Sequence, residues 1–338
     1  MASLNLFKNS VFQMMQLTQA FEKLPIKPSL LGDMGLFEFE GIRQKTFAIE
    51  SVDGVLTLIP FSERGAPTQQ DTQEEREVRA FLTRHFKKQA KIWAAEIAGV
   101  REFGSETELK QMQKEVLKRA MKLRREAELT FEYHRLNAIQ GLVKNTTGAS
   151  VYNWYTEFGI DVPDVINFDL DNATPVKGAL RMQCHDIADG IADSLGGDAD
   201  ANSLEIEAVA HPSFFNKFTS HKEVLEAWMY AGKVAEQTGK TLKTFEWGGI
   251  TWRKYRGGSG VSLAAGEVRF VPKGVPGMFR HYASPAETGE FVNTPGLEHY
   301  FRLIPDLARD EYVELELEAN PMFICTRPGA LRKGTRTS

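Results

Sequence analysis

The feature that most constrains this chain is an apolar β-hairpin whose sequence neighbours offer it nothing to pack on. Two strand-like segments, residues 45–51 and 55–59, flank Asp53-Gly54, a dipeptide typical of a two-residue type I′ turn. Strand alternation places four apolar side chains on one face: Phe47, Ile49, Leu56 and Leu58. An isolated hairpin is marginally stable in water, and the residues that follow are polar. We therefore predict that this hairpin extends from the body and docks on another surface, that of a neighbouring chain included.

Composition places the chain among ordinary globular proteins. Its 338 residues are 42% hydrophobic and 25% charged, which suits two domains with a sizeable core. The formal net charge of −4 gives no global signal for nucleic acid or membrane. Cys184 and Cys325 lie far apart, so we expect two buried, reduced thiols. No apolar stretch approaches the roughly 20 residues that span a bilayer, and the amphipathic N-terminus predicts an arm over residues 1–36.

The clearest helix of the chain is predicted over residues 105–141. Ser105 and Glu108 form a capping box at its start, and Gly141 is a typical C-terminal stop. Apolar residues recur between them at spacings of three and four, namely Leu109, Met112, Val116, Ala120, Leu123, Ala127 and Phe131. At 1.5 Å per residue the helix would be roughly 50 Å long, which suits a spine that crosses a whole subunit.

The remaining segments alternate between strands and helices. Residues 78–86 favour a strand over a helix, and residues 93–98 favour a short helix. Residues 152–280 predict one mixed α/β domain, with a tight hairpin turning at Gly248-Gly249. Its expected strands are 165–170, 204–210, 244–247, 250–252 and 268–271, and its helices lie within 176–195 and 211–237. Beyond it, residues 311–318 and 323–325 predict two more strands.

Known chemical motifs are poorly matched. Residues 256–260 are rich in glycine but lack the lysine and the strand–helix context of a phosphate-binding loop. Asp198, Asp200 and Asn202 imitate the first calcium ligands of an EF-hand, but later positions depart from that pattern. His185-Asp186 is the pair most like a metal or acid–base site, yet neighbours on a helix point in different directions. We expect no catalytic residue, no metal site and no cofactor.

Basic residues form a stripe along the predicted spine helix. Lys110, Lys114, Lys118 and Lys122 recur every four residues, which aligns them along one slowly drifting side. Such a stripe suits contact with a polyanion such as DNA. A solvated face, or pairing with glutamates of neighbouring subunits, explains the same pattern and stays open.

The order of these elements resembles the lambda-type phage major capsid proteins, the phage capsid protein E family. The resemblance covers nearly the whole chain and rests on the order and spacing of short motifs. These are Thr46–Glu50, Asp53-Gly54, Leu58–Pro60, Arg64–Pro67, Glu96-Ile97, Phe103-Gly104, Phe245–Ile250, Tyr255–Gly257, Pro272–Gly274, Gly277–Phe279, Ala283–Pro285, Asn293–Gly296, Asn320-Pro321 and Arg327-Pro328.

The resemblance implies an α+β fold, the tailed-phage major capsid fold of the Hong Kong 97 type. It divides the chain into an N-terminal arm (1–36), an extended hairpin loop (37–72), a peripheral domain with the spine helix (73–151), an axial domain (152–280) and a peripheral return (281–338). The hairpin would lie over an adjacent subunit through Phe47, Ile49, Asp53, Gly54, Leu56 and Leu58.

The same resemblance implies the partners. Copies would form pentamers and hexamers of an icosahedral head shell around double-stranded DNA. We expect a separate scaffolding protein, a portal protein and no membrane, while a decoration protein stays an open alternative. The shell would assemble in the host bacterial cytoplasm, and we expect no lysine–asparagine cross-link at Lys45.

Two other functions remain open on the sequence. An encapsulin-like shell would share the fold and enclose a cargo enzyme instead of a genome. A soluble hydrolase would use His185 and Asp186.

Overall fold

The computed structural model describes residues 29–52, 76–93, 108–172, 174–196, 204–230, 243–258, 260–309 and 311–337. Contacts divide the chain into two units, each assembled from segments distant in sequence. Unit 1 comprises Met1–Ala48, Ala80–His134 and Arg280–Phe323, and unit 2 comprises Ile49–Arg79, Arg135–Phe279 and Ile324–Ser338. No helix among the described residues is long and apolar enough to cross a membrane.

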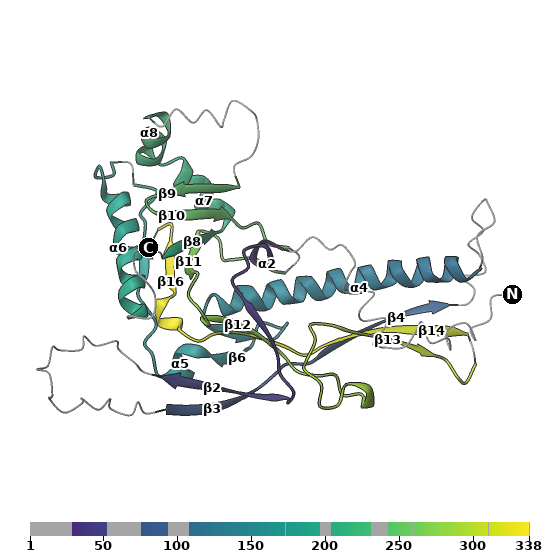
Figure 1. Ribbon diagram of the computed structural model, residues 1–338. Coiled ribbons are helices and arrows are strands. Elements are labelled where there is room, and N and C mark those ends of the chain that lie inside the picture. Colours follow the sequence, from purple (N-terminus) through teal and green to yellow (C-terminus); the bar gives the residue numbers. More distant parts are fainter. Residues whose placement is uncertain are drawn as a thin grey trace, which may run out of the picture. The chain divides into compact units, whose positions relative to one another are not determined.

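A long helix and a narrow sheet form the core of unit 1. Helix α4 (Glu108–Ala138) has 31 residues and runs along the sheet of β13 (Tyr300–Pro305), β14 (Tyr312–Ala319) and β4 (Phe86–Trp93), as Figure 1 shows. The strand order is β13-β14-β4, and both pairings are antiparallel. The predicted spine helix is confirmed, and Gly141 follows its end with φ 73°, a left-handed conformation suited to glycine.

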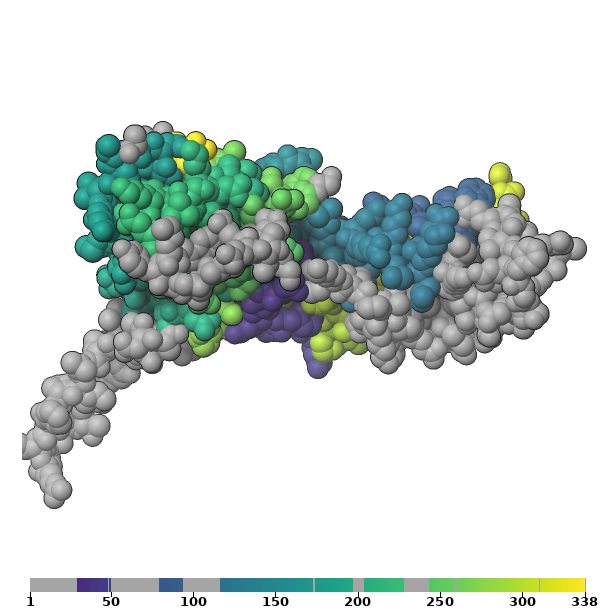
Figure 2. Space-filling model, turned by 90° about the horizontal axis from the view of Figure 1, so that it is seen from above, coloured from purple at the N-terminus to yellow at the C-terminus, as the bar shows by residue number. Residues whose placement is uncertain are grey.

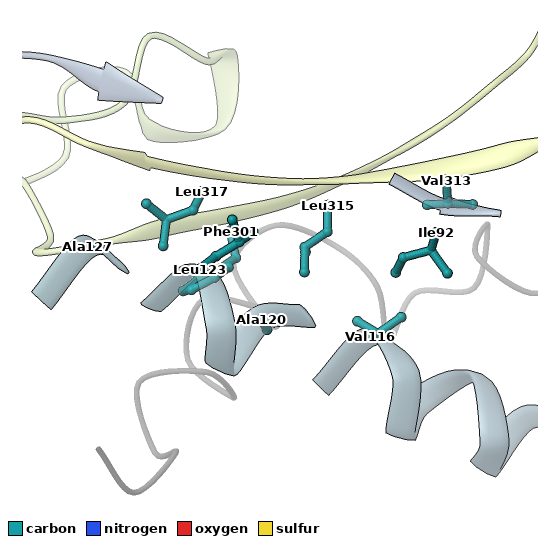
Figure 3. Close-up of a cluster of buried hydrophobic side chains, with 9 residues drawn as sticks. All are labelled: Ile92, Val116, Ala120, Leu123, Ala127, Phe301, Val313, Leu315 and Leu317. Atoms are coloured by element: carbon teal, nitrogen blue, oxygen red, sulfur yellow. The ribbon is translucent and has the colours of Figure 1, made fainter. Parts of the chain in front are cut away.

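Alternate residues of β14 meet the apolar side of α4. Val313, Leu315 and Leu317 point to the helix, where Val116 and Leu123 face them (Figure 3). All five side chains are at most 3% exposed. The 3.6-residue period of α4 and the two-residue period of the strand thus bury matching stripes, which explains why this helix is stable over its length.

The opposite face of the same sheet is charged. Glu314 pairs with Lys91 at 3.3 Å, and Glu318 pairs with Lys87 at 2.9 Å. Glu316 completes the series through Arg302 of β13. Because the acids alternate with the buried leucines along β14, each opposite-charge pair reports the register of a neighbouring strand.

A second small sheet of unit 1 brings together distant parts of the chain. Its order is β1-β12-β15, with β1 (Glu38–Gly41), β12 (Phe279–Ala283) and β15 (Pro321–Cys325). Near it, the short helix α2 (Leu30–Asp33) is held by α4, since Glu132 accepts hydrogen bonds from Ser29 Oγ at 2.5 Å and Leu31 N at 3.1 Å. The described end of the predicted arm is therefore fixed to the spine.

The first strand of the predicted hairpin has a different partner in the described structure. Strand β2 (Thr46–Val52) pairs with β3 (Arg76–Leu82) in a two-stranded sheet. The expected second strand, 55–59, and the Asp53-Gly54 turn lie outside the described residues. Within the described residues, β2 therefore pairs with β3, a strand that lies well after the predicted turn in the sequence.

Unit 2 is built on a mixed six-stranded sheet. Its order is β7-β16-β11-β8-β10-β9, and β8 is parallel to β10 but antiparallel to β11. The strands are β7 (Val165–Asn167), β8 (Glu205–Ala210), β9 (Thr244–Trp247), β10 (Ile250–Lys254), β11 (Glu267–Lys273) and β16 (Arg332–Thr335). The hairpin at Gly248-Gly249 is confirmed, with φ of 64° and 77° and Trp247 opposite Ile250.

Three helices accompany this sheet: α6 (Ala179–Leu195), α7 (Pro212–Thr219) and α8 (Lys222–Tyr230). Trp252 of β10 is fully buried and stacks on Phe218 of α7 at 3.8 Å. Gly248 approaches Cys184 of α6 so closely that a Cβ there would lie 2.8 Å from the cysteine Cβ. The unit also contains β5 (Leu142–Lys144), β6 (Ser150–Asn153), α5 (Trp154–Phe158) and η5 (Pro328–Ala330), and η4 (Gly289–Phe291) belongs to unit 1.

Three expectations need correction. The strand expected over 78–86 ends at Leu82, and a new strand, β4, begins at Phe86. Trp93 ends that strand instead of starting a helix, because β4 pairs along its whole length with β14. The last strand, β16, lies between β7 and β11 in the sheet of unit 2, so the segment 281–338 does not return as a whole to a peripheral sheet.

Both cysteines are free and buried, as expected. Burial raises the pKa of the Cys184 thiol to about 12, and burial also raises the pKa of Cys325 to about 12. Both thiols are therefore protonated and unreactive near neutral pH.

Candidate assembly surfaces

The base of the β2–β3 ribbon is covered by its own chain. Phe47 is 6% exposed and stacks on Tyr282 with ring centroids 4.6 Å apart. Phe81 of β3 lies against the Phe47 ring, with centroids 5.9 Å apart, and Ile49 is 8% exposed. Phe47 and Ile49 are therefore not free apolar surface in the single chain, which corrects that part of the hairpin hypothesis.

The remaining predicted ribbon residues, Asp53, Gly54, Leu56 and Leu58, lie outside the described part of the chain. Their contact with a neighbouring subunit stays a prediction.

Polar contacts hold the same ribbon base. Lys45 pairs with Glu287 at 2.5 Å, and this partner keeps the pKa of the Glu287 carboxyl below its usual value. Thr83 donates its backbone N–H to the Lys45 carbonyl and its hydroxyl to Ser284 Oγ at 2.9 Å. Both strands of the ribbon are thus tied to the segment after β12. The Lys45 ammonium serves in this ion pair.

Near the ribbon base, the buried side chain of Asn320 contacts two segments that are distant from it in the sequence. Its Nδ2 donates to the Pro285 carbonyl at 3.0 Å, and its Oδ1 lies 2.6 Å from His85 Nδ1. Because an amide oxygen only accepts, the His85 Nδ1 carries the proton in this contact. The network ties together the segments that follow β3, β12 and β14 in the chain.

The outer side of α4 is basic in its described part. Lys118 and Lys122 are exposed, and Arg125 lies on the same side of the helix. Figure 2 shows that atoms of α4 lie at the molecular surface in the view from above. Lys110 and Lys114 belong to α4, but their side chains lie outside the description.

Three acids in the described part of α4 have other partners. Glu126 pairs with Lys88 at 3.0 Å, Glu128 lies 3.8 Å from His299 Nε2, and Glu132 holds Ser29 and Leu31. These three carboxylates are thus directed to partners other than Lys122 and Arg125, which are exposed and can attract an anion.

His185 and Asp186 sit side by side on the exposed face of α6. They do not converge, since successive helical residues point about 100° apart. Among the described residues, no group of three or more His, Cys, Asp or Glu side chains could hold a metal ion. The calcium-like residues Asp198, Asp200 and Asn202 lie outside the described chain.

One surface cavity of about 470 Å³ borders this helix. Its walls come from the start of α6, from α8 and from the β9–β10 turn, and they carry charges of both signs. The charged lining residues are Lys177, Arg181, Glu223 and Glu226, and His185 lies beside them.

The architecture of both units is that of known capsid proteins. The putative capsid protein of a prophage of E. coli CFT073 matches with a TM-score of 0.61 at 10% identity, covering 96% of this chain and 98% of that one. The capsid of cyanophage P-SCSP1u matches with a TM-score of 0.52 at 10% identity, covering 93% and 90%. The fold is thus the Hong Kong 97 type of tailed-phage capsid proteins.

Sequence comparison defines the family. The family model "Phage major capsid protein E" matches residues 13–336, so this chain belongs to the phage major capsid protein E family. It is 27% identical over 350 residues to the major capsid protein of Pseudomonas phage KPP10, covering 96% of each chain. It is 26% identical over 364 residues to that of Salmonella phage Felix O1, again covering 96% of each.

The chain is therefore a phage structural protein whose copies associate into the virion capsid. This function needs no catalytic constellation, and it places the physical interest of the molecule in its surfaces. The predicted fold class and function are confirmed.

Proposed function

We propose that this major capsid protein builds an icosahedral head shell from pentamers and hexamers and encloses double-stranded DNA. The observation that carries the proposal is the basic side of α4, where Lys122 and Arg125 are exposed while Glu126 is engaged by Lys88. A polyanion releases counterions when such a face binds it, so the interaction weakens as salt is added.

In this proposal the two units have the roles of peripheral and axial domains. The α4 helix is the spine of the peripheral domain, and the six-stranded sheet belongs to the axial domain around five- and six-fold axes. The ribbon that starts at β2 and β3 reaches an adjacent subunit through residues beyond its covered base. Rings of this kind use heterologous contacts, in which two different patches of one subunit meet its two neighbours.

The proposal includes further partners. A separate scaffolding protein guides assembly in the host bacterial cytoplasm, and a portal protein occupies one vertex. A decoration protein remains an open alternative for the outer surface. These partners are supported by the membership of the family.

Electron microscopy of the protein expressed with its neighbouring phage genes tests the proposal. We expect closed icosahedral particles, and DNA-filled particles when the packaging genes are present. Nuclease-resistant DNA should be recovered from the filled particles by phenol extraction. Particles that instead enclose a protein cargo and never hold DNA would support the encapsulin-like alternative and contradict the proposal.

A further inference from the structure

The exposed side of α6 carries its charges in an order that the helix itself disfavours. One ridge of positions four apart begins just before the helix and continues to its last turn. Its members are Lys177, Arg181, His185, Asp189 and Asp193. Arg181, Asp189 and Asp193 are exposed, so the bases stand at the N-terminal end and the acids at the C-terminal end. Figure 1 shows α6 at the outside of the six-stranded sheet of its unit.

Local energetics do not explain this order. The helix dipole favours acids near the N-terminus and bases near the C-terminus, which is the reverse of what α6 presents. Within the helix the ridge also places two like charges four residues apart, Asp189 and Asp193, and such a pair destabilises a helix. An isolated α6 would therefore be more stable with the two halves exchanged.

The fold of the single chain compensates the two halves unequally. Glu223 and Glu226 of α8 line the same cavity as Lys177 and Arg181, so acids of the same chain lie near the basic half. Within the described residues, Arg181, Asp186, Asp189 and Asp193 make no ion pair. Lys177 reaches Glu226 only at 3.9 Å, with its side chain 90% exposed. The acidic half in particular is left facing outward.

We propose that α6 is a contact between copies of this chain, in which the basic half of one α6 meets the acidic half of the next. The two halves have opposite charge and the same helical spacing, so one surface carries both members of a complementary pair. Met182 and Val176 are 61% and 75% exposed, and they add apolar area beside the charges. The occupant is a second copy because the family self-associates and because the complement of each half is the other half.

This inference rests on the ring assembly proposed above and names the surface that the rings use. Each copy in a ring has two neighbours. The two halves of α6 lie about 12 Å apart along the helix, since eight residues separate them and each residue adds 1.5 Å.

Charge reversal tests the contact. Arg181→Glu and Asp189→Lys each place like charges in the contact, and we expect each to lower the assembled fraction about tenfold at low salt. The double variant restores opposite charges in exchanged positions and should recover assembly to within about twofold of wild type. The assembled fraction is measured by sedimentation velocity and checked by negative-stain microscopy. Arg256→Glu, at an exposed position of the same unit outside α6, is the matched control and should assemble normally.

Misfolding is separated from lost contact by the direction of the stability change. Arg181→Glu puts an acid in the first turn, where the helix dipole favours it, and Asp189→Lys turns the like-charge pair with Asp193 into an opposite-charge pair. The isolated subunit should therefore unfold at the same or a higher urea concentration than wild type in both variants. Single variants that assemble like wild type, or a double variant as impaired as the singles, would overturn the contact. A wild-type chain that assembles into no ring or shell would instead contradict the proposed function itself.

Discussion

The ring of Phe47 stacks on the ring of Tyr282, with centroids 4.6 Å apart and planes 23° from parallel. This contact joins the first strand of the ribbon to β12, a strand more than two hundred residues later in the chain. The base of the ribbon is therefore packed within unit 1, and the first prediction concerns this contact.

Replacing Phe47 with Ala should loosen the ribbon. The side chain is 6% exposed, and loss of a buried phenylalanine typically costs about 3–5 kcal/mol. We expect a lower urea midpoint and faster amide exchange in β2 and β3. Leu82→Ala, at a 52% exposed position of β3, is the control and should change the midpoint little. Equal effects of the two variants would contradict the anchoring role.

The spine core should respond strongly to truncation. Leu315 is fully buried between β14 and α4, and Leu315→Ala should lower the free energy of unfolding by about 2–5 kcal/mol. Leu307 follows β13 and is 84% exposed, so Leu307→Ala should change it by less than about 0.5 kcal/mol. Denaturation monitored by circular dichroism checks both values. A small loss at Leu315 would mean that helix and sheet are not held by this apolar stripe.

Glycine is required where the segment after β12 crosses β1. A Cβ at Gly296 would overlap the carbonyl oxygen of Ala283, and Gly296 N donates to the Ile42 carbonyl at 2.9 Å. Gly296→Ala should therefore destabilise unit 1 by about 1–3 kcal/mol, because the backbone must shift. Gly289 has open space around its Cα, so Gly289→Ala is the matched control. Thermal unfolding of the two variants should differ clearly, and indistinguishable midpoints would argue against the crossing.

His134 should make the subunit sensitive to acid. Burial lowers the pKa of His134 from 6.5 to about 4, and the ring stacks on Phe323 at 6.4 Å. Between these pKa values the unfolded chain binds a proton that the folded chain does not, so stability falls as the pH drops from about 6.5 to about 4. His134→Phe should flatten this part of the stability–pH curve. The contribution is measured as the difference between the two proteins in urea titrations across that range, since other groups titrate equally in both. An identical slope would contradict it.

The basic side of α4 should matter for the genome and not for the shell. Replacing Lys110, Lys114, Lys118 and Lys122 together by Gln removes four charges from one side of the helix. We expect particles of normal form that retain less DNA, with a larger loss at high salt. Retention is measured as nuclease-resistant DNA per particle. A matched replacement of Lys87 and Lys91, which pair with glutamates of β14, should leave retention unchanged. Equal retention in the four-lysine variant would reject contact with DNA.

Several parts of the fold could be predicted because they depend on neighbours in the sequence. The apolar period from Val116 to Phe131 defines α4, and the hairpin at Gly248-Gly249 follows from a turn that needs positive φ. The family resemblance also came from local motifs in order, and the family model confirms it. Local rules suffice for these elements because their hydrogen bonds are formed within a few residues.

The candidate surfaces were predicted less completely. The alternation around Phe47 and Ile49 correctly indicated a buried strand face, but not that Tyr282 and Phe81 cover Phe47. The reversed charges of α6 were visible in the sequence as Arg181, Asp189 and Asp193. Their meaning depends on which side of the helix is exposed and on the absence of ion pairs among the described residues, and only the tertiary structure shows these.

The sequence by itself determined the spine helix, the tight hairpin of unit 2 and the membership of a capsid family, since each is encoded in local periodicity or short motifs. The tertiary structure decided that β2 pairs with β3, that β4 continues to Trp93 and that β16 enters the sheet of unit 2. The physical reason is that the backbone hydrogen bonds of a strand can be formed with any exposed strand edge that the folded chain brings close to it. Residues distant in sequence compete for that edge, and the burial of apolar faces settles which of them pair.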